Sequence, residues 1–388
     1  MKKIFYAKQT IDAKDINAVA AVLRSNYLTQ GPQIEAFEEA VAEYCGAKYA
    51  VAVNSGTSAL HIACLASGLK ANDEGITSAI TFAATSNAML YCGARPVFAD
   101  IDDASICVSP EELKKKINRK TRVIIPVHFA GTPCEMDKIY KIAKPLNIPV
   151  IEDACHALGA SFRGSRIGSC KYSDMTILSF HAVKHITCGE GGMVLTNNRV
   201  LYQRLLLLRS HGISRKPLLS QKCQDPWQYD MQELGFNFRL TDIQCALGYS
   251  QLKKLGTFIK QRRAIVERYT QTFSKLNEVT VPYCEPYAQS SHHLYVLRFD
   301  FNKLKADKRE IYDEYKKRGI ILNVHYMPVY YHSYYAEKGY KKGICPKAEK
   351  YYHEAFTLPL FPRMNNEDIK RVIETTEAVI HRFRGGKL

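Results

Sequence analysis

Residues 175–192 read MTILSFHAVKHITCGEGG. Met175–His181 predicts a buried strand, because it is a short apolar run without polar alternation. Lys184 follows in a short turn, and three glycines loosen the chain before a second apolar run, Gly192–Thr196. A lysine in a glycine-rich turn is usually a surface lysine, so its meaning depends on what the rest of the chain places beside it.

Similar apolar runs alternate with helical patterns through the first two-thirds of the chain. Short apolar strands separated by helices are typical of a mainly parallel sheet covered on both faces. The sequence therefore predicts a doubly wound α/β core. The further strands expected are Tyr49–Val53, Pro96–Ala99, Arg122–Phe129 and Ile148–Glu152, with helices after Asn54 and over Met136–Lys144.

Beyond about residue 250 the pattern changes to a smaller α+β domain. We expect a large α/β domain over residues 1–250, including the N-terminal arm, and the smaller domain over 251–388. The elements expected in the second domain are helices over Gln251–Leu276, Lys308–Arg318 and from Glu367 onward, and strands over 292–299 and 320–326.

Bulk composition is that of a soluble globular protein, with 46% hydrophobic and 24% charged residues. The first residues lack the apolar core of a secretory signal, and the longest uncharged stretch, Gly75–Ala94, contains Thr, Ser and Asn. Twelve cysteines are present, but none forms a C-x-x-C pair or a Cys/His cluster. We therefore expect a cytoplasmic protein with reduced thiols, no membrane span and no metal.

Net charge is +16, and residues 191–388 carry most of it, with 33 Lys and Arg against 19 Asp and Glu. Such a basic half suits an anionic partner: nucleic acid, anionic lipid or a small phosphorylated substrate. On charge alone, a solvated basic surface is the simpler interpretation.

Two further motifs follow predicted strands, where an open α/β sheet places its ligands. Asn54–Ser58 (NSGTS) joins a strand to a helix, and Gly56 with free amides and hydroxyls offers an anion site. An ordinary helix cap is the alternative. Asp153, in EDACHALG, closes another strand and either serves catalysis or caps a helix.

The order of these groups predicts pyridoxal phosphate. A phosphate cradle comes first, then an acid, then a lysine 31 residues after Asp153. Pyridoxal phosphate requires an amine for a Schiff base, a carboxylate at its pyridine nitrogen and an anion site. An aromatic face should also clamp the ring, and Phe82 in ITFAATSNA follows another strand.

The strings SGTSALH, ITFAATSNA, EDACHALGA, SFHAVKHITCGEGG and FNFRLTDIQCALGYSQLKK resemble motifs of the DegT/StrS-type sugar aminotransferases over nearly the whole chain. The resemblance implies a fold-type-I pyridoxal-phosphate enzyme and a homodimer with shared active sites. It assigns the Schiff base to Lys184, the pyridine nitrogen to Asp153, the neighbourhood of the ring oxygen to His156, and the phosphate to Gly56, Thr57, Ser58, Ser179 and, from the other subunit, Asn237.

Within that family, FYAKQTIDAKDINAV, VHFAGTPCEMD and NVHYMPVYYHSYY are similar to the members that act in pseudaminic acid biosynthesis. These use L-glutamate to aminate UDP-2-acetamido-2,6-dideoxy-β-L-arabino-hexos-4-ulose at C4, giving UDP-4-amino-4,6-dideoxy-N-acetyl-β-L-altrosamine. For Tyr6 and Tyr326, ordinary packing is the alternative to substrate contact. The resemblance assigns substrate contacts to Tyr6, Asn26, Tyr27, Leu28, Thr29, Gly56, Ser179, Asn237, Asn323, Val324, His325 and Tyr326.

Departures from the family pattern are conservative in size: EGITSAITF at a strand entry, and Cys155 and Cys188 where Ala and Thr are commoner. One subset of the family has histidine in place of the lysine and dehydrates sugars, so Lys184 favours transamination. Amination of a different UDP- or dTDP-linked keto-sugar and sugar dehydration remain alternatives. A nucleic-acid-binding regulator is a third, but the chain shows no separate binding module.

Overall fold

A computed structural model describes residues 2–214, 225 and 227–385. Its centre is a twisted sheet built from two groups of strands joined by parallel bridges at Ile124–Val150 and Val127–Asp153. Only β10 runs antiparallel to its neighbours in this sheet. In spatial order the strands are β2 (Tyr49–Val53), β10 (Gly192–Thr196), β9 (Met175–Ser179), β6 (Ile151–Asp153), β5 (Thr121–Ile125), β3 (Glu74–Ser78) and β4 (Arg95–Ala99).

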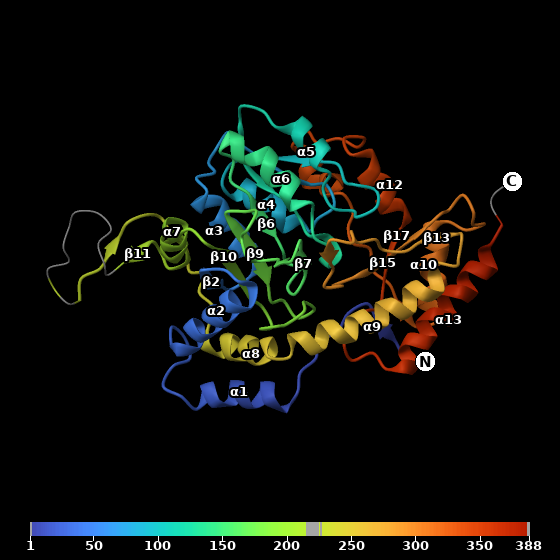
Figure 1. The fold of residues 1–388 in the computed structure, drawn as a ribbon, viewed down its shortest axis with the longest axis horizontal. Helices are drawn as coiled ribbons and strands as arrows, with labels where there is room; N and C mark the ends of the chain where they lie inside the picture. Colours follow the sequence, from blue (N-terminus) through green and yellow to red (C-terminus); the bar gives the residue numbers. More distant parts are fainter. Residues whose placement is uncertain (1, 215–224, 226, 386–388) are drawn as a thin grey trace.

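Helices cover both faces of this sheet (Figure 1). Packed against one face are α3 (Gly56–Ala66), α4 (Ala83–Tyr91) and α7 (Arg199–Arg209). Against the other lie α2 (Pro32–Cys45), α5 (Pro110–Lys116), α6 (Met136–Ala143) and α8 (Asp242–Leu252), with α1 (Ala13–Leu23) outside α8.

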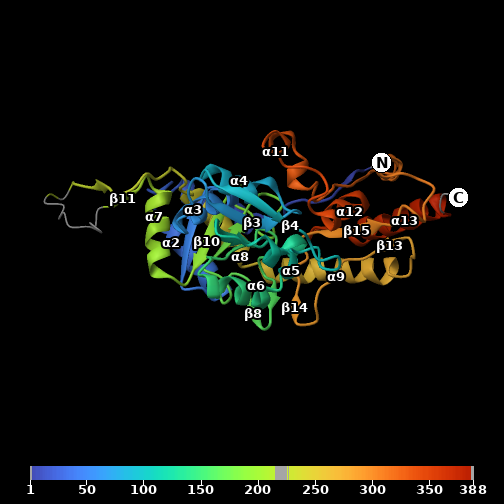
Figure 2. The same ribbon diagram turned by 90° about the horizontal axis from the view of Figure 1, so that it is seen from above.

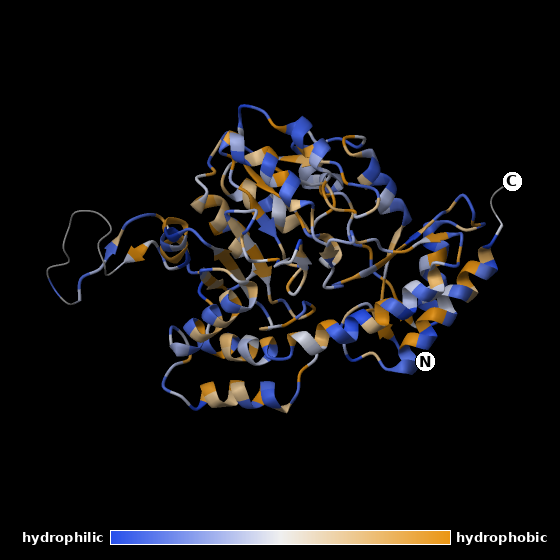
Figure 3. Ribbon diagram, viewed as in Figure 1, coloured by the Kyte–Doolittle hydropathy of each residue, from blue (hydrophilic) through white to orange (hydrophobic). Residues whose placement is uncertain are grey.

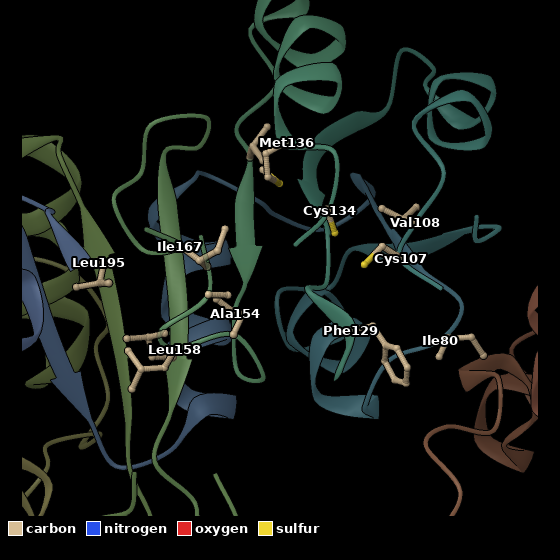
Figure 4. Packing of buried hydrophobic residues seen from close by; sticks show 14 of the residues in the cluster. Ile80, Cys107, Val108, Phe129, Cys134, Met136, Ala154, Leu158, Ile167 and Leu195 are labelled. Carbon is tan, nitrogen blue, oxygen red and sulfur yellow. The ribbon is translucent and has the colours of Figure 1, made fainter. Parts of the chain in front are cut away.

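The alternation of side chains along each strand builds two cores. In β2, Ala50 and Ala52 join the core under α2 and α8, while Val51 and Val53 join the core under α3 and α7. Figure 3 shows hydrophobic residues concentrated on the central strands, and Figure 4 shows the packing in the first core, for example around Phe129. Burial on both faces explains why these strands carry continuous apolar runs.

The C-terminal part has a core of its own, built on the antiparallel sheet β13–β15–β17 and helices α9, α10 and α13. Near the N-terminus, β1 (Ile4–Phe5) pairs in parallel with β16 (Ile320–Ile321), so the N-terminal arm joins this part. The remaining bounds are α9 (Leu255–Phe273), β13 (Val279–Thr280), β15 (Tyr295–Phe299), α10 (Lys308–Lys317), α11 (Ser333–Glu337), α12 (Pro346–Glu354), β17 (Ala355–Leu358) and α13 (Asn366–Phe383).

Small hairpins complete the described chain. One of them projects beyond α7 in Figure 1. This hairpin is formed by β11 (Ile213–Ser214) and β12 (Asp230–Met231). A second small sheet consists of β7 (Ser161–Phe162), β8 (Ser165–Arg166) and β14 (Ala288–Gln289).

Several expected elements are wrong in extent: the strand predicted over Ile148–Glu152 begins at Ile151, and the strand predicted over 292–299 begins at Tyr295. The strand predicted to reach Phe129 ends at Ile125, because Pro126 has no N–H to donate to a neighbouring strand. The strand predicted over 320–326 stops at Ile321; the Asn323 side chain instead accepts a hydrogen bond from the Val324 N–H at 2.8 Å. The long helix predicted from residue 251 is two helices, α8 and α9, and α8 begins earlier, at the Thr241 capping box.

The predicted α/β class, with a mainly parallel sheet flanked by helices and a smaller α+β part, is confirmed. The boundary near residue 250 stays a proposal, supported by the separate C-terminal core. In the portion of the chain with described coordinates, no helix is both long and apolar enough to span a bilayer.

Candidate active site

A cavity of about 680 Å³ opens at the carboxyl ends of the central strands. It brings together the loops after β2, β3, β5, β6 and β9, where an open α/β sheet binds its ligands. Of the residues predicted from the sequence, its lining includes Tyr6, Gly56, Thr57, Phe82, Asp153, His156, Ser179, Lys184, Asn323, Val324, His325 and Tyr326.

The anion cradle is the N-terminus of α3. Ser55 caps the helix by accepting a hydrogen bond from the Ser58 N–H at 3.1 Å, while the amides of Gly56 and Thr57, in the first turn, need an outside acceptor. A Cβ on Gly56 would lie 3.0 Å from the Ser179 Cβ, so a larger residue here would press the two loops apart by a few tenths of an ångström. Ser58 does not line the cavity, since its hydroxyl donates to Asn54 Oδ1 at 2.6 Å.

Asp153 ends β6 and is 5% exposed. Its carboxylate accepts hydrogen bonds from the Thr85 hydroxyl at 2.7 Å and from the Cys155 N–H at 3.2 Å. Thr85 has one hydroxyl proton and gives it to Asp153, so the hydroxyl of Thr81, 2.7 Å away, donates to Thr85. Sequence reasoning missed Thr85; its only signal is a hydroxyl in the first turn of the helix that follows Phe82.

Lys184 lies in the turn after β9, where its N–H donates to the His181 carbonyl at 2.9 Å. Its side chain is partly buried and lines the cavity with Asp153 and Cys155. Burial lowers the pKa of Lys184 below its ordinary 10.5, although Cys155 and Asp153 oppose the shift. A lysine with a lowered pKa supplies more of the neutral amine, which is the nucleophilic form.

A segment of the C-terminal part, residues 323–326, forms the opposite wall. The Tyr326 hydroxyl lies 3.1 Å from His156 Nε2, and the two rings stack. His325 bonds the Thr357 hydroxyl through Nδ1 at 2.8 Å, and its ring packs on Tyr6 at 5.2 Å. Burial, with the charge of Lys184, lowers the pKa of His325 to about 3. This wall therefore carries neutral hydrogen-bonding groups.

Phe82 stands at the mouth of the cavity. It is 61% exposed, and its ring centroid lies 6.2 Å from that of Tyr326. An exposed aromatic face at a cavity entrance is available to cover a planar ring inside.

His293 is a cavity residue that sequence reasoning missed. Its ring lies 4.4 Å from the ring of His156, and burial holds the pKa of both imidazoles well below the usual range. The neighbouring Ser291 hydroxyl donates to the His156 carbonyl at 3.1 Å. No local pattern marks this position, because the contact joins segments more than a hundred residues apart.

Two predicted groups lie elsewhere. Asn26–Thr29 and Asn237 are exposed and do not line the cavity of their own chain. Tyr27 instead borders a separate hollow between α1 and α8. The single chain therefore does not assemble all the residues that the resemblance assigned.

The cavity fits pyridoxal phosphate. It combines a helix N-terminus for the phosphate, a carboxylate for a pyridine nitrogen and an amine of lowered pKa for an aldehyde. Moreover, Nδ1 of His156 is buried and has no partner within residues 2–214, 225 and 227–385. No cluster of three or more His, Cys, Asp or Glu suited to a metal occurs in that same part of the chain.

Comparison with known proteins gives a consistent picture. A model of the DegT/DnrJ/EryC1/StrS aminotransferase family matches residues 9–377. The UDP-4-amino-4,6-dideoxy-N-acetyl-beta-L-altrosamine transaminase of Campylobacter jejuni (strain 81-176) is 39% identical over 387 residues, covering 99% of each chain. The spore coat polysaccharide biosynthesis protein SpsC of Bacillus subtilis is 36% identical over 97% of this chain and 96% of its own.

A similar solved structure is Helicobacter pylori PseC, an aminotransferase involved in the biosynthesis of pseudoaminic acid. It superposes with a TM-score of 0.91 at 33% identity, covering 98% of this chain and all of the other. Solved neighbours include forms with pyridoxal phosphate and pyridoxamine phosphate. The fold-type-I prediction is thereby confirmed.

Proposed function

The chain belongs to the DegT/DnrJ/EryC1/StrS aminotransferase family, and from that premise we propose that it transfers the amino group of L-glutamate to C4 of UDP-2-acetamido-2,6-dideoxy-β-L-arabino-hexos-4-ulose. It is a pyridoxal-phosphate-dependent sugar aminotransferase. Its product would be UDP-4-amino-4,6-dideoxy-N-acetyl-β-L-altrosamine. The observation that carries the proposal is the 39% identity, over 99% of both chains, to a transaminase named for that product.

Bound pyridoxal phosphate supplies an aldehyde for the amine and a ring that accepts electrons. Lys184 would hold the cofactor through its Nζ, and the same amine, when free, would accept a proton from the α-carbon of the amino donor. Burial lowers its pKa, so the free amine accepts a proton more readily near neutrality.

Asp153 would hold the pyridine nitrogen of the cofactor, and a carboxylate in that position would favour a proton on the nitrogen. The Thr85 hydroxyl, 2.7 Å from Asp153, fixes the orientation of this carboxylate. The Tyr326 hydroxyl of the opposite wall lies 3.1 Å from Nε2 of His156, and these two polar groups would line the space for the cofactor ring and the sugar. The first amides of α3, with Ser179, would hold the phosphate of the cofactor.

We further propose a homodimer in which Asn237 and Asn26–Thr29 of one copy complete the cavity of the other. Support comes from their exposure and from the fact that none of them lines the cavity of its own chain. Large apolar side chains nearby are exposed as well, including Leu28 at 48% and Leu234 at 79%.

Complementation tests this arrangement. Lys184→Ala and Asn237→Ala homodimers should each be inactive. A heterodimer of the two contains one site with both substitutions and one site with neither, so mixing them should restore part of the activity. If the mixture stays as inactive as its parents, Asn237 acts within its own chain.

A substrate panel tests the chemistry. Purified protein is offered UDP- and dTDP-linked 4-keto-6-deoxy sugars with L-glutamate, and the aminated product is identified. Consumption of glutamate in equal amount to the proposed product supports the assignment. Faster amination of another keto-sugar would replace the substrate, and loss of water from the sugar without glutamate consumption would indicate a dehydratase.

Reaction in the cytoplasm is also proposed. The cysteines with described positions are free thiols, most of them buried, as in proteins of reducing compartments. Cell fractionation with an antibody checks this directly.

A further inference from the structure

The loop that follows β5, residues 126–132, contacts several side chains of the candidate active site. Val127 lines the cavity itself. The Phe129 ring packs against the rings of His156 and Tyr326, with centroids 6.3 Å apart in each pair. The position of this loop therefore affects the wall that faces the cofactor ring.

The same loop holds a segment of the C-terminal part beside the site. Residues 290–294 connect β14, which pairs with β7, to β15 of the C-terminal part, drawn in orange in Figure 2. The Ala130 carbonyl accepts a hydrogen bond from the His293 N–H at 2.9 Å, and the Gly131 carbonyl accepts one from the Ser291 N–H at 3.1 Å. The position of the His293 ring in the cavity therefore depends on this loop.

Asp153 is joined to the loop through its backbone. The His128 N–H donates to the Asp153 carbonyl at 3.0 Å, and the Asp153 N–H donates to the Pro126 carbonyl at 2.9 Å. A shift of the loop would therefore also move the Asp153 carboxylate, which is the partner for a pyridine nitrogen.

The backbone of the loop has an unfavourable conformation. Ala130 has a φ of 56°, in the left-handed region, and Gly131 has a φ of 95°. The left-handed conformation is disfavoured for a residue with a Cβ, because the Cβ crowds the carbonyl oxygen that follows. Such a conformation persists where the surrounding structure holds the chain in place. The loop therefore needs an anchor.

The buried pair His128 and Glu152 provides this anchor. His128 is fully buried, and Glu152 is 3% exposed. Nδ1 of His128 accepts a hydrogen bond from the Cys134 N–H at 3.0 Å, so it carries no proton. The proton is therefore on Nε2, which donates to the Glu152 carboxylate at 2.7 Å. Both ring nitrogens of His128 are engaged, one by each end of the link.

Glu152 is held in turn by β9 and the segment before it. Its carboxylate accepts hydrogen bonds from the hydroxyls of Ser173 and Thr176, the latter at 3.3 Å. Side chains alternate along β6, so Glu152 lies on the same face as Ala154, in the core of Figure 4, while Asp153 reaches the cavity from the other face. The pair thus joins the loop to two strands on the side of the sheet opposite to Asp153.

Burying these two polar groups in an apolar core adds little to stability, because the loss of water around them offsets most of what their pairing contributes. Neither side chain lines the cavity, so neither is placed to touch the cofactor or the substrate. We propose that His128 and Glu152 are positioning residues, which hold the loop after β5 and thereby keep the Asp153 carboxylate where it binds the cofactor ring. This inference concerns the cofactor alone and does not depend on which sugar is aminated.

The bound cofactor can report this arrangement directly. Its visible circular dichroism, divided by its absorbance after free cofactor is removed by gel filtration, depends on how the protein surrounds the ring. The ratio does not depend on how much protein is folded, because both signals come from bound cofactor. A role in folding alone would therefore leave the ratio unchanged.

His128→Asn is the main test. Asparagine keeps an acceptor near the Cys134 N–H but is too short to donate to Glu152. We expect the ratio of circular dichroism to absorbance to change. The dissociation constant of the cofactor, from absorbance titration, should rise on the order of 10-fold, the scale at which outer partners of a binding group act in metal sites.

Two variants serve for comparison. His128→Gln can still donate to Glu152 through its amide, so both cofactor readings should lie closer to those of the parent. Asp100→Asn is the matched control: the Asp100 carboxylate is 5% exposed, lies outside the cavity, and accepts hydrogen bonds from the N–H groups of Lys347 and Ala348 at 3.0 and 2.9 Å. It should lower the free energy of unfolding of the cofactor-free protein in urea and leave both cofactor readings unchanged.

A parent-like ratio and dissociation constant in His128→Asn would overturn the proposal, because the pair would then serve folding alone. If His128→Asn does not fold, Glu152→Gln gives the same test. It keeps one oxygen for the hydroxyls of Ser173 and Thr176 and removes the oxygen that accepts from His128. Changed cofactor readings in Glu152→Gln support the positioning role, and unchanged readings overturn it.

Discussion

The Thr85→Val substitution tests the hydrogen-bond chain behind the cofactor site. Valine keeps the shape of threonine but removes the hydroxyl that donates to Asp153 at 2.7 Å. Asp153 is 5% exposed, and it also accepts a hydrogen bond from the Cys155 N–H at 3.2 Å. Losing a buried hydrogen bond to a charged group costs about 1.5–3 kcal/mol, and the Thr81 hydroxyl also loses its acceptor.

The free energy of unfolding of the cofactor-free protein, from urea denaturation, should therefore fall by about 2–3 kcal/mol. Thr77→Val is the matched control, because this buried threonine of β3 donates at 2.7 Å to the neutral carbonyl of Ile125. Its loss should cost about 1 kcal/mol.

Cofactor affinity gives a second measurement. An Asp153 carboxylate that has lost its orientation should bind the pyridine nitrogen less well, so the dissociation constant from absorbance titration should rise in Thr85→Val and stay unchanged in Thr77→Val. Equal destabilisation of the two variants, with unaltered cofactor affinity in both, would refute the reasoning.

Three further predictions concern backbone space and protonation. Gly192→Ala should lower the free energy of unfolding, measured by urea denaturation, by about 1–3 kcal/mol and weaken cofactor binding, because its Cβ would lie 2.3 Å from the Ser55 carbonyl oxygen. Gly256→Ala is the control: open space surrounds this glycine, so the same measurement should show no change or a slight stabilisation. Lys184→Met should stabilise the cofactor-free protein at pH 8, because burial lowers the pKa of Lys184 in the folded state alone. In urea denaturation, the difference in free energy of unfolding between variant and parent should shrink as the pH rises toward 10.5. A difference that stays constant with pH would contradict this prediction. Burial lowers the pKa of His292 to about 4, so between pH 6.5 and pH 4 the unfolded chain binds a proton that the folded chain does not. The free energy of unfolding therefore falls as the pH falls through that window. His292→Gln should remove up to about 3 kcal/mol of this loss, as the difference between the free energies of unfolding at pH 7 and pH 4.

Much of the fold was predictable because its signals are local. The strand β10 and the strand–turn–helix over residues 49–66 were predicted from the sequence at the positions where the structure has them. The predicted bounds were wrong where a single residue interrupts the apolar pattern of a strand. For example, β5 ends before Pro126, which has no N–H to donate.

The candidate site divides in the same way. The sequence alone indicated that an anion cradle, Asp153 and Lys184 each stand at the end of a strand, and a parallel sheet brings the ends of its strands to one edge. That inference needs only strand order.

Tertiary structure decided which other side chains reach that edge. Thr85 and Asp153 are 68 residues apart, and His293 meets His156 only because the C-terminal part folds back over the sheet. Asn237, by contrast, lies away from the cavity of its own chain. Contacts of this kind depend on how whole helices and loops pack, and no spacing along one strand or helix encodes them.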